Sequence, residues 1–512
     1  MYVGTMAERF PQRQALVIGD GEVVLSFAEL DARSNQVAHA LRELGLGVGD
    51  TVAVMMESCE QFFEVWWAAM RTGLYLTPIN WHLTAPEVAY LVADSGAKVL
   101  VHSGRLAEIV DRAVGADTPV HLVSVGETGI ERSLDYRSLR DAQPTTRVDG
   151  EIDGAPMFYS SGTTGQPKGI RKRLSGAAPW EGRSRMIPIA SRFGLTEGCR
   201  YLSPGPVYHV APSLWPAAAQ AVGGTAVVMR RFDAEAALML IDHQGITDSQ
   251  WVPTMLQRML RLPDDVRARY DLSSHRRAWT AAAPISVDVK RRMIEWWGPI
   301  LLEYYSSSEG GGTMITSEEW LQHPGSVGRH YAGGKVYVFD GDFAELPAGR
   351  EGAIYFEPQP GAAFEYHNDP AKTAESHHGD LFTAGDIGYL DDDGYLYLTD
   401  RQSNVIIAGG VNIYPREIEE AIATHPGVAD VAVFGIPDDD TGERVHAVIQ
   451  PIDPANAETL IDDVRAHLED RLARQKIPRS FEIDEQLPRE ENGKLYKRLL
   501  RDPYWVGRSR RI

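Results

Sequence analysis

Residues 159–169 read Tyr-Ser-Ser-Gly-Thr-Thr-Gly-Gln-Pro-Lys-Gly, and this short stretch is the most informative part of the chain. Its three glycines allow sharp turns that bring backbone N–H groups close to an anion, and its four hydroxyls and Lys168 add donors and a positive charge. This composition predicts a loop that binds nucleotide phosphates. Pro167 and Gly169 flank the lysine, so the spacing differs from a Walker P-loop and disfavours a P-loop kinase or GTPase. A polar surface turn is the alternative that the stretch alone leaves open.

Length and composition describe a globular protein with several folding units. The chain has 512 residues, 43% of them hydrophobic, and a formal net charge of −20, which disfavours sequence-independent binding to nucleic acid. Cys59 and Cys199 form no Cys-x-x-Cys pair, so neither a disulfide framework nor a thiolate zinc site is predicted. The first ten residues lack the apolar region of a signal peptide. We therefore expect a cytoplasmic protein.

One uncharged stretch, residues 210–229, is nominally long enough to span a bilayer. Pro212, Pro216 and the Gly223–Gly224 pair interrupt it, which favours a buried helix followed by a core strand. No membrane span is therefore predicted.

Alternating helical and strand patterns predict the fold class. Helical spacing in residues 27–46, 60–71 and 85–94 is followed each time by a short apolar run, which indicates a parallel sheet covered by helices. The pattern recurs over residues 232–302. From about Val327, short alternating strands predict a β-rich subdomain. We predict an α/β protein with a large N-terminal domain of residues 1–400 and a small α+β C-terminal domain of residues 401–512.

Further motifs carry side chains suited to nucleotide chemistry. Residues 304–310 offer a flat ring for a base, hydroxyls, and Glu309 for Mg2+ held together with phosphate oxygens. Asp386 could accept bonds from ribose hydroxyls, and Lys494 lies on a predicted loop. Tyr208 and His209 lie in an apolar segment bounded by prolines. Each motif also has a structural alternative. Residues 304–310 would then be a core strand that ends in a polar loop, and Asp386 a turn residue. Lys494 would be a solvated surface lysine, and His209 a core histidine.

In this order and at these separations, the motifs resemble the adenylate-forming superfamily of acyl-CoA synthetases, peptide-synthetase adenylation domains and luciferase-like enzymes. The loop at 159–169 is similar to the family's phosphate signature, and residues 305–309 to its Tyr-Gly-x-Thr-Glu segment. Asp386 and Arg401 match its ribose contacts, and Lys494 matches its C-terminal catalytic lysine. The segments EYYSSSEGGG and AGGVNIYPREIE look most like those of bacterial fatty-acid and bile-acid-type CoA ligases.

The resemblance implies an AMP-forming acid–CoA ligase that uses ATP, Mg2+ and CoA. The carboxylate of a small-molecule acid attacks ATP, pyrophosphate leaves, and rotation of a mobile C-terminal domain then allows transfer of the acyl group to CoA. The implied catalytic residues are Lys494, Thr164, Glu309 and His209, with Glu309 also the metal ligand. The implied cofactor-binding residues are Ser160, Ser161, Gly162, Thr163, Thr164, Gly165, Lys168, Tyr305, Ser308, Asp386, Arg401 and Gly410. The implied substrate pocket contains Tyr208, His209, Trp251, Ala282 and Ser306.

Two departures from the family pattern bear on these expectations. Ser403 stands where the family often has Asp or Lys in the hinge, and Ser306 stands where glycine is usual. Together with the bulk of Trp251, the added Cβ of Ser306 indicates a restricted acyl site. The sequence leaves open which acid is activated, the second nucleophile, and the oligomeric state, for which a homodimer is one candidate. The alternatives are a natural-product-pathway ligase, a nitrite-activating diazotase and a non-catalytic adenylate sensor, the last disfavoured by the retained Lys494.

Overall fold

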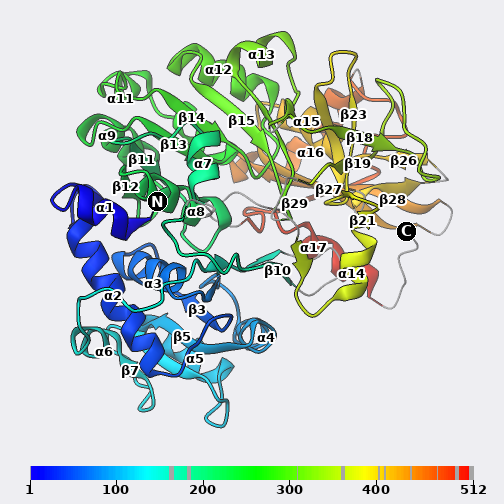
Figure 1. Cartoon of the computed structure of the whole chain (residues 1–512). Helices are drawn as coiled ribbons and strands as arrows, with labels where there is room; N and C mark the ends of the chain where they lie inside the picture. The colour runs from blue at the N-terminus through cyan, green and yellow to red at the C-terminus, as the bar shows by residue number, and fades with distance from the viewer. Residues whose placement is uncertain are drawn as a thin grey trace.

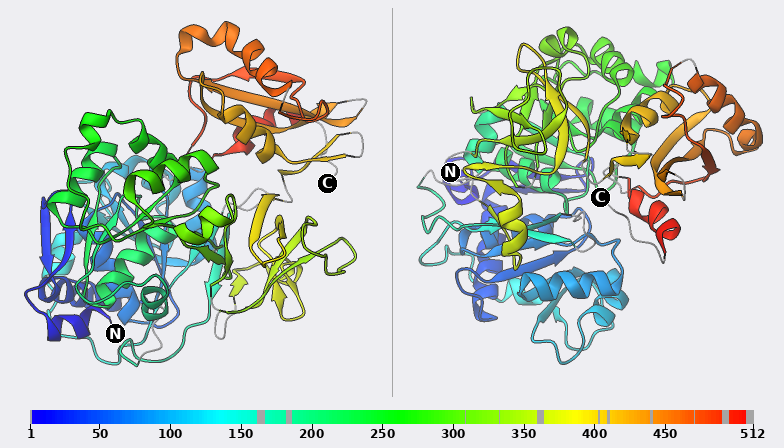
Figure 2. Two further views of the ribbon diagram at one scale, coloured as in Figure 1. Left: turned by 90° about the horizontal axis from the view of Figure 1, so that it is seen from above. Right: turned by 90° about the vertical axis from the view of Figure 1, so that its right-hand side faces the viewer.

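The computed structural model describes residues 2–160, 167–181, 186–307, 309–331, 333–358, 364–401, 404–408, 411–438, 441–469, 471–489 and 495–506. These residues form two large sheets with flanking helices, a β-rich subdomain and a small C-terminal unit (Figure 1). The C-terminal unit, orange to red, stands apart from the blue and green sheets (Figure 2). The predicted fold class is confirmed, whereas the boundary at 400/401 stays a prediction.

The first sheet is entirely parallel, because each strand is followed by a crossover rather than by a hairpin. The three predicted helices of this region are confirmed as α2 (Phe27–Glu43), α3 (Glu60–Arg71) and α4 (Ala85–Ser95). Ser26 and Glu29 form a capping box that fixes the start of α2. In spatial order the strands are β7 (Leu134–Asp135), β6 (His121–Val125), β5 (Ala97–Ser103), β3 (Thr51–Met55), β4 (Tyr75–Pro78) and β8 (Ala155–Pro156).

The second sheet has a parallel centre and antiparallel edges. Its strands in spatial order are β17 (Arg329–His330), β16 (Thr313–Ile315), β15 (Leu301–Tyr305), β14 (Arg277–Thr280), β13 (Asp248–Trp251), β11 (Arg200–Ser203), β12 (Thr225–Val228), β1 (Gln14–Ile18) and β2 (Val23–Ser26). The stretch at 210–229 forms helix α8 (Val210–Ala221) and then β12, as predicted. Among the described residues, no helix combines the length and the apolar character needed to cross a bilayer.

The helices that cover these two sheets, and the short ones between their strands, include α1 (Val3–Arg9), α5 (Ala107–Ala113), α6 (Tyr136–Asp141), α7 (Met186–Arg192), α9 (Ala234–His243), α10 (Pro253–Leu260), α11 (Asp264–Arg267), α12 (Val287–Trp297) and α13 (Ser317–Gln322). Successive residues of the central strands face opposite sides of the second sheet, so that sheet separates two apolar cores. One core contains Trp215, Trp279 and Tyr304, and the other contains Trp251.

The β-rich subdomain and the C-terminal unit complete the chain. Strands β9 (Phe158–Ser160), β10 (Lys168–Lys172) and β20 (Phe364–Tyr366) form a small sheet. The β-rich subdomain contains β18 (Val336–Phe339), β19 (Gly352–Phe356), β21 (His377–His378), β22 (Leu381–Phe382), β23 (Asp386–Leu390), β24 (Leu396–Arg401) and helix α14 (Pro370–Glu375). The C-terminal unit contains β25 (Ile406–Ala408), β26 (Val411–Ile413), α15 (Pro415–Ala423), β27 (Val428–Asp438), β28 (Gly442–Pro451), α16 (Ala457–Glu469), β29 (Ser480–Ile483) and α17 (Lys497–Arg501).

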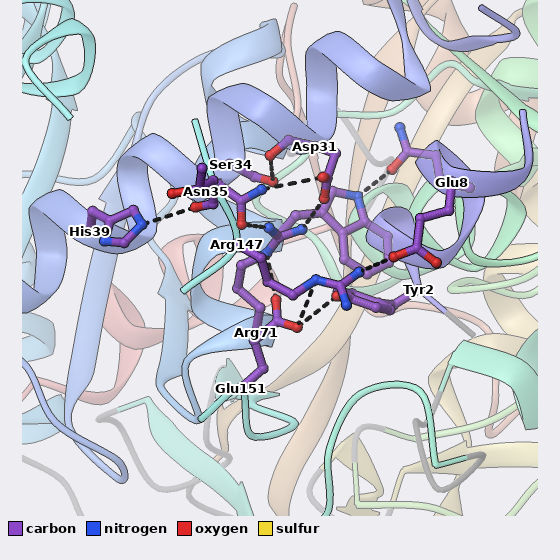
Figure 3. Close-up of polar contacts among 12 residues, drawn as sticks. Tyr2, Glu8, Asp31, Ser34, Asn35, His39, Arg71, Arg147 and Glu151 are labelled. Atoms are coloured by element: carbon purple, nitrogen blue, oxygen red, sulfur yellow. Dashed lines mark hydrogen bonds and ion pairs between the residues drawn. The ribbon is translucent and has the colours of Figure 1, made fainter. Parts of the chain in front are cut away.

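A buried ionic network joins α1, α2, α3 and the segment that precedes β8 (Figure 3). Arg71 at the end of α3 is 0% exposed, and its Nη2 lies 2.5 Å from Asp31 Oδ1 while its Nε lies 3.6 Å from Glu151 Oε1. The Tyr2 hydroxyl donates to Glu151 Oε2 at 2.7 Å, and Arg147 Nε lies 3.4 Å from the same oxygen. Charged groups in such a place must be paired, because an unpaired buried charge is strongly unfavourable.

Candidate active site

The glycine-rich segment at 159–169 is built into a β-hairpin. Strands β9 and β10 pair antiparallel, with Ser160 opposite Lys168 and Tyr159 opposite Gly169. Because the chain after Lys168 continues as a strand, the segment is not the strand-to-helix turn of a Walker P-loop. The predicted phosphate ligands Ser161, Gly162, Thr163, Thr164 and Gly165 lie outside the described residues, as does Ser308, and their roles stay predictions; Ser160 is described only as a strand residue.

Helix α4 holds both ends of this hairpin loop. The Tyr159 hydroxyl donates to Asp94 Oδ2 at 2.7 Å, and the Tyr90 hydroxyl donates to the Pro167 carbonyl at 2.9 Å. Burial raises the pKa of Tyr159, so its hydroxyl stays protonated and remains a donor. Gly169 lets the Tyr159 ring lie against the backbone, since a Cβ there would come within 3.0 Å of that ring.

Lys168 lies at the start of β10 and forms an ion pair with the β-rich subdomain. Its Nζ lies 2.5 Å from Asp369 Oδ2 and 5.9 Å from the centre of the Tyr366 ring. Asp369 also caps α14, because its other carboxylate oxygen accepts from the Lys372 backbone N–H at 2.9 Å. The bond from Lys168 lowers the pKa of Asp369, which keeps this acid charged. An incoming phosphate would therefore compete with Asp369 for the lysine.

The predicted metal ligand Glu309 is buried beside the same subdomain. Its Oε1 accepts from the Tyr366 hydroxyl at 2.8 Å, and the residue is 9% exposed. Among the described residues, no three carboxylate, imidazole or thiolate groups gather into a protein-only metal site. A single carboxylate near the hairpin suits Mg2+, which proteins usually hold through one or two carboxylates, phosphate oxygens and water. Glu309 thus fits the expected cation.

The residues predicted to contact adenine and ribose lie together. The Tyr305 hydroxyl donates to Asp386 Oδ2, although the two residues are 81 positions apart. Asp386 is 7% exposed and pairs across the β23–β24 ladder with Arg401. The structure therefore brings a ring, a carboxylate and the backbone of Arg401 to one place. The side chain of Arg401 is not among those described.

Apart from Trp251, which is the last residue of β13, the predicted pocket residues follow the carboxyl ends of the parallel strands β11, β14 and β15. Ligands bind in this position in open α/β sheets, because loops from several strands meet there. Tyr208 is 6% exposed, and its ring centre lies 4.4 Å from that of His209, the residue before α8. Ala282 follows β14 with φ 72°, a left-handed conformation that costs a non-glycine residue about 1–2 kcal/mol. Such strain is often found at functional sites.

Most of the chain matches two family models of known proteins. The family model described as AMP-binding enzyme matches residues 4–366, and the model described as AMP-binding enzyme C-terminal domain matches residues 417–494. The chain belongs to the AMP-binding enzyme family. The resemblance to the adenylate-forming superfamily is thereby confirmed.

Relatives of this AMP-binding enzyme differ in their second substrate. A fatty acid–[acyl-carrier-protein] ligase of Streptomyces coeruleorubidus is 32% identical, with 95% of this chain and 93% of the relative covered. A long-chain-fatty-acid–CoA ligase of Mycobacterium tuberculosis is also 32% identical, with 96% of each covered. The solved structure of a Mycobacterium tuberculosis fatty acyl CoA synthetase has a TM-score of 0.73 at 30% identity, covering 99% of this chain and 98% of that one. That of the Marinactinospora thermotolerans amide bond synthetase has a TM-score of 0.81 at 25% identity, covering 98% and 99%.

Two expected pocket residues of the AMP-binding enzyme are placed differently from the others. Trp251 is 1% exposed in the core on the far side of the second sheet, where Nε1 donates to Ser249 Oγ at 2.6 Å and the ring packs on Trp297. The structure thus places Trp251 as a packing residue. Ser306 is exposed, and its hydroxyl donates to the Gly311 carbonyl at 2.9 Å. This hydrogen bond links two residues of the loop that follows β15.

Sequence reasoning missed several residues beside the site. They are Asp369, Tyr366, Gln250 and three aromatic residues that cluster around Tyr304 of the 304–310 motif, namely Phe193, Trp215 and Trp279. Asp369 carried one local signal, since an acid before Pro370 is typical of a helix start. Nothing local in the sequence pairs it with Lys168, which lies 201 positions earlier.

The C-terminal unit of the AMP-binding enzyme is joined to β24 by Asp400. Its carboxylate accepts from the backbone N–H of Arg416 in the first turn of α15 and from Asn404 Nδ2, both at 3.1 Å. Near the end of the chain, Lys497 Nζ lies 2.8 Å from Glu419 Oε1 of α15. The predicted catalytic Lys494 and the predicted Gly410 lie outside the described residues, and their roles remain predictions.

Proposed function

We propose that this AMP-binding enzyme is an AMP-forming acid–CoA ligase. The observation that carries the proposal is the convergence of three distant segments on the β9–β10 hairpin. Lys168 and Glu309 both approach Tyr366, and Tyr305 is hydrogen-bonded to Asp386 at the start of β23. A cation, a carboxylate for Mg2+ and a ring beside a carboxylate are what a nucleoside triphosphate requires along its length.

In the first proposed step, a carboxylate oxygen of the acid attacks the α-phosphorus of ATP. A new oxygen–phosphorus bond forms, the bond from the α-phosphorus to the bridging oxygen breaks, and pyrophosphate leaves. Lys168 and the hairpin hold the departing phosphates, while Tyr305 and Asp386 hold adenine and ribose. Mg2+ bound at Glu309 would shield phosphate charge. Lys494 would bridge the acid and the α-phosphate, and position and charge are enough for that role.

In the second proposed step, the sulfur of CoA attacks the acyl carbon of the adenylate. The carbon–sulfur bond forms, the bond between the acyl carbon and the phosphate oxygen breaks so that AMP leaves, and the thiol proton passes to solvent water. Transfer to an acyl carrier protein is the second candidate, because the carrier-protein ligase of Streptomyces coeruleorubidus is as similar to this chain as the CoA ligase of Mycobacterium tuberculosis.

Pyrophosphate release with a panel of carboxylic acids, with and without CoA, tests the proposal. We expect acid-dependent release, and thioester formation only when CoA is present. Lys494→Ala should abolish release while ATP still binds in a calorimetric titration. Lys476→Ala is the matched control, because this lysine of the same unit is paired with Glu417 at the surface. Pyrophosphate release that does not depend on any acid would overturn the proposal.

A further inference from the structure

An aromatic cluster lies beneath the loops that follow the parallel strands. It consists of Phe193, Trp215, Trp279 and Tyr304, each 8% exposed or less. The ring centre of Phe193 lies 4.3 Å from that of Trp215, 4.7 Å from that of Trp279 and 5.0 Å from that of Tyr304. Rings at these separations are in direct contact, so the cluster fills its space.

The position of the cluster relates it to the acid rather than to the nucleotide. Trp279 on β14 lies in the same core as Ala281, which follows that strand, and Tyr304 directly precedes Tyr305. Trp215 lies on α8, the helix that begins after His209. The cluster is therefore the floor under the pocket loops, on the face of the sheet away from Trp251.

The floor also carries polar groups. Gln250 Nε2 donates to the Tyr304 hydroxyl at 2.5 Å. Trp279 is 3% exposed, and within the described part of the chain its indole N–H has no hydrogen-bond partner. A buried donor without a partner is unfavourable, and a ligand that supplies an acceptor removes that cost.

We propose that the acid is compact, no longer than a short alkyl chain or one substituted ring, and carries an oxygen acceptor for the indole N–H of Trp279. The inference rests on the proposed function. A long alkyl chain would have to displace rings that already touch one another. Pocket fit discriminates by about tenfold or more for each misplaced methylene, so palmitate is a poor substrate.

Pyrophosphate release with matched acids provides the test. The panel pairs 4-methoxybenzoate with 4-ethylbenzoate, and 4-oxopentanoate with 4-methylpentanoate, and adds octanoate and palmitate. We expect kcat/KM to be about tenfold higher for the oxygenated member of at least one pair, and palmitate to be at least about 100-fold below the best acid. Preference for palmitate overturns the inference but leaves the proposed function standing. If none of these acids supports pyrophosphate release, the result contradicts the proposed function itself, and with it the inference that rests on that function.

Two variants separate the indole donor from the bulk of the floor. Trp279→Phe should remove the preference for the oxygenated acids while compact acids remain best. Phe193→Ala, which removes a ring of the cluster that carries no hydrogen-bond donor, should raise kcat/KM for octanoate by about tenfold relative to 4-methylpentanoate. Trp66→Phe is the matched control, because Trp66 on α3 is 0% exposed and its indole N–H is likewise without a partner in the described structure. An unchanged acid preference in both Trp279→Phe and Phe193→Ala overturns the inference.

Discussion

Replacing Arg71 by methionine tests whether the buried ionic network holds the N-terminal helices in place. Arg71 is 0% exposed and is paired with Asp31 and Glu151, whose side chain is also 0% exposed. Removing one member of such a network leaves an uncompensated buried charge, which typically destabilises by about 3–5 kcal/mol. Arg71→Met should therefore lower the urea midpoint by at least about 1 M, given a slope of about 1–3 kcal/mol per molar urea.

The destabilisation should also depend on pH. Burial raises the pKa of Glu151, and Arg71 opposes that effect, so the pKa rises further without the arginine. Above pH 4.5, the ordinary pKa of a glutamate, the unfolded chain releases the Glu151 proton while the folded protein still holds it. The free energy of unfolding therefore falls as the pH rises above this value. The loss in Arg71→Met should be larger at pH 7 than at pH 5.

Two further variants make this reasoning refutable. Combining Arg71→Met with Glu151→Gln removes one of the two acids, Asp31 and Glu151, that lose their partner. The double variant should therefore recover about half of the lost free energy of unfolding. Arg9→Met is the control, because the pair of Arg9 with Glu197 is about half exposed and should contribute at most about 1 kcal/mol. Urea unfolding followed by tryptophan fluorescence measures all three. A loss below about 1 kcal/mol in Arg71→Met, or the same loss at both pH values, would refute the argument.

Three other predictions concern the candidate site. Tyr305→Phe removes the donor to Asp386, and since a hydrogen bond to a charged group contributes about 1.5–3 kcal/mol, KM for ATP should rise at least tenfold in a pyrophosphate-exchange assay. Asp369→Asn should lower KM for ATP by up to about fivefold, because a partly exposed ion pair with Lys168 contributes up to about 1 kcal/mol; a raised KM would show that Asp369 instead positions the lysine. Ala282→Gly should raise the free energy of unfolding by about 1 kcal/mol, since glycine adopts positive φ without strain, and a destabilised variant would contradict this.

The helices and the order of the domains could be predicted from the sequence because their signals are local. Apolar spacing located α2, α3 and α4 to within a few residues, and the Gly223–Gly224 pair marked the break between α8 and β12, whereas Pro212 and Pro216 lie inside α8. Likewise, the residues expected to contact adenine and ribose, Tyr305 and Asp386, proved to be hydrogen-bonded.

The acid pocket could not be predicted in the same way. Strands β13 (Asp-Ser-Gln-Trp) and β14 (Arg-Ala-Trp-Thr) have four residues each and place polar residues on both faces, so apolar alternation does not reveal which face a side chain occupies. Trp251 and Trp279 lie on adjacent strands, yet they belong to opposite cores, and only the register of β13 against β14 distinguishes them. The pairing of Lys168 with Asp369 is a second example, because it depends on where α14 begins.

The contact made by Asp400 affects how this protein can be divided for study. A C-terminal fragment that starts at Arg401 would lack the carboxylate that accepts from the first turn of α15 and from Asn404. Isotope labelling of that unit by ligation, or its expression as an independent fragment, therefore calls for a junction upstream of Asp400. The turn before β24, at Asp391–Gly394, is a suitable position for this junction. A fragment that begins there keeps β24, and with it the Asp400 carboxylate that accepts from the first turn of α15.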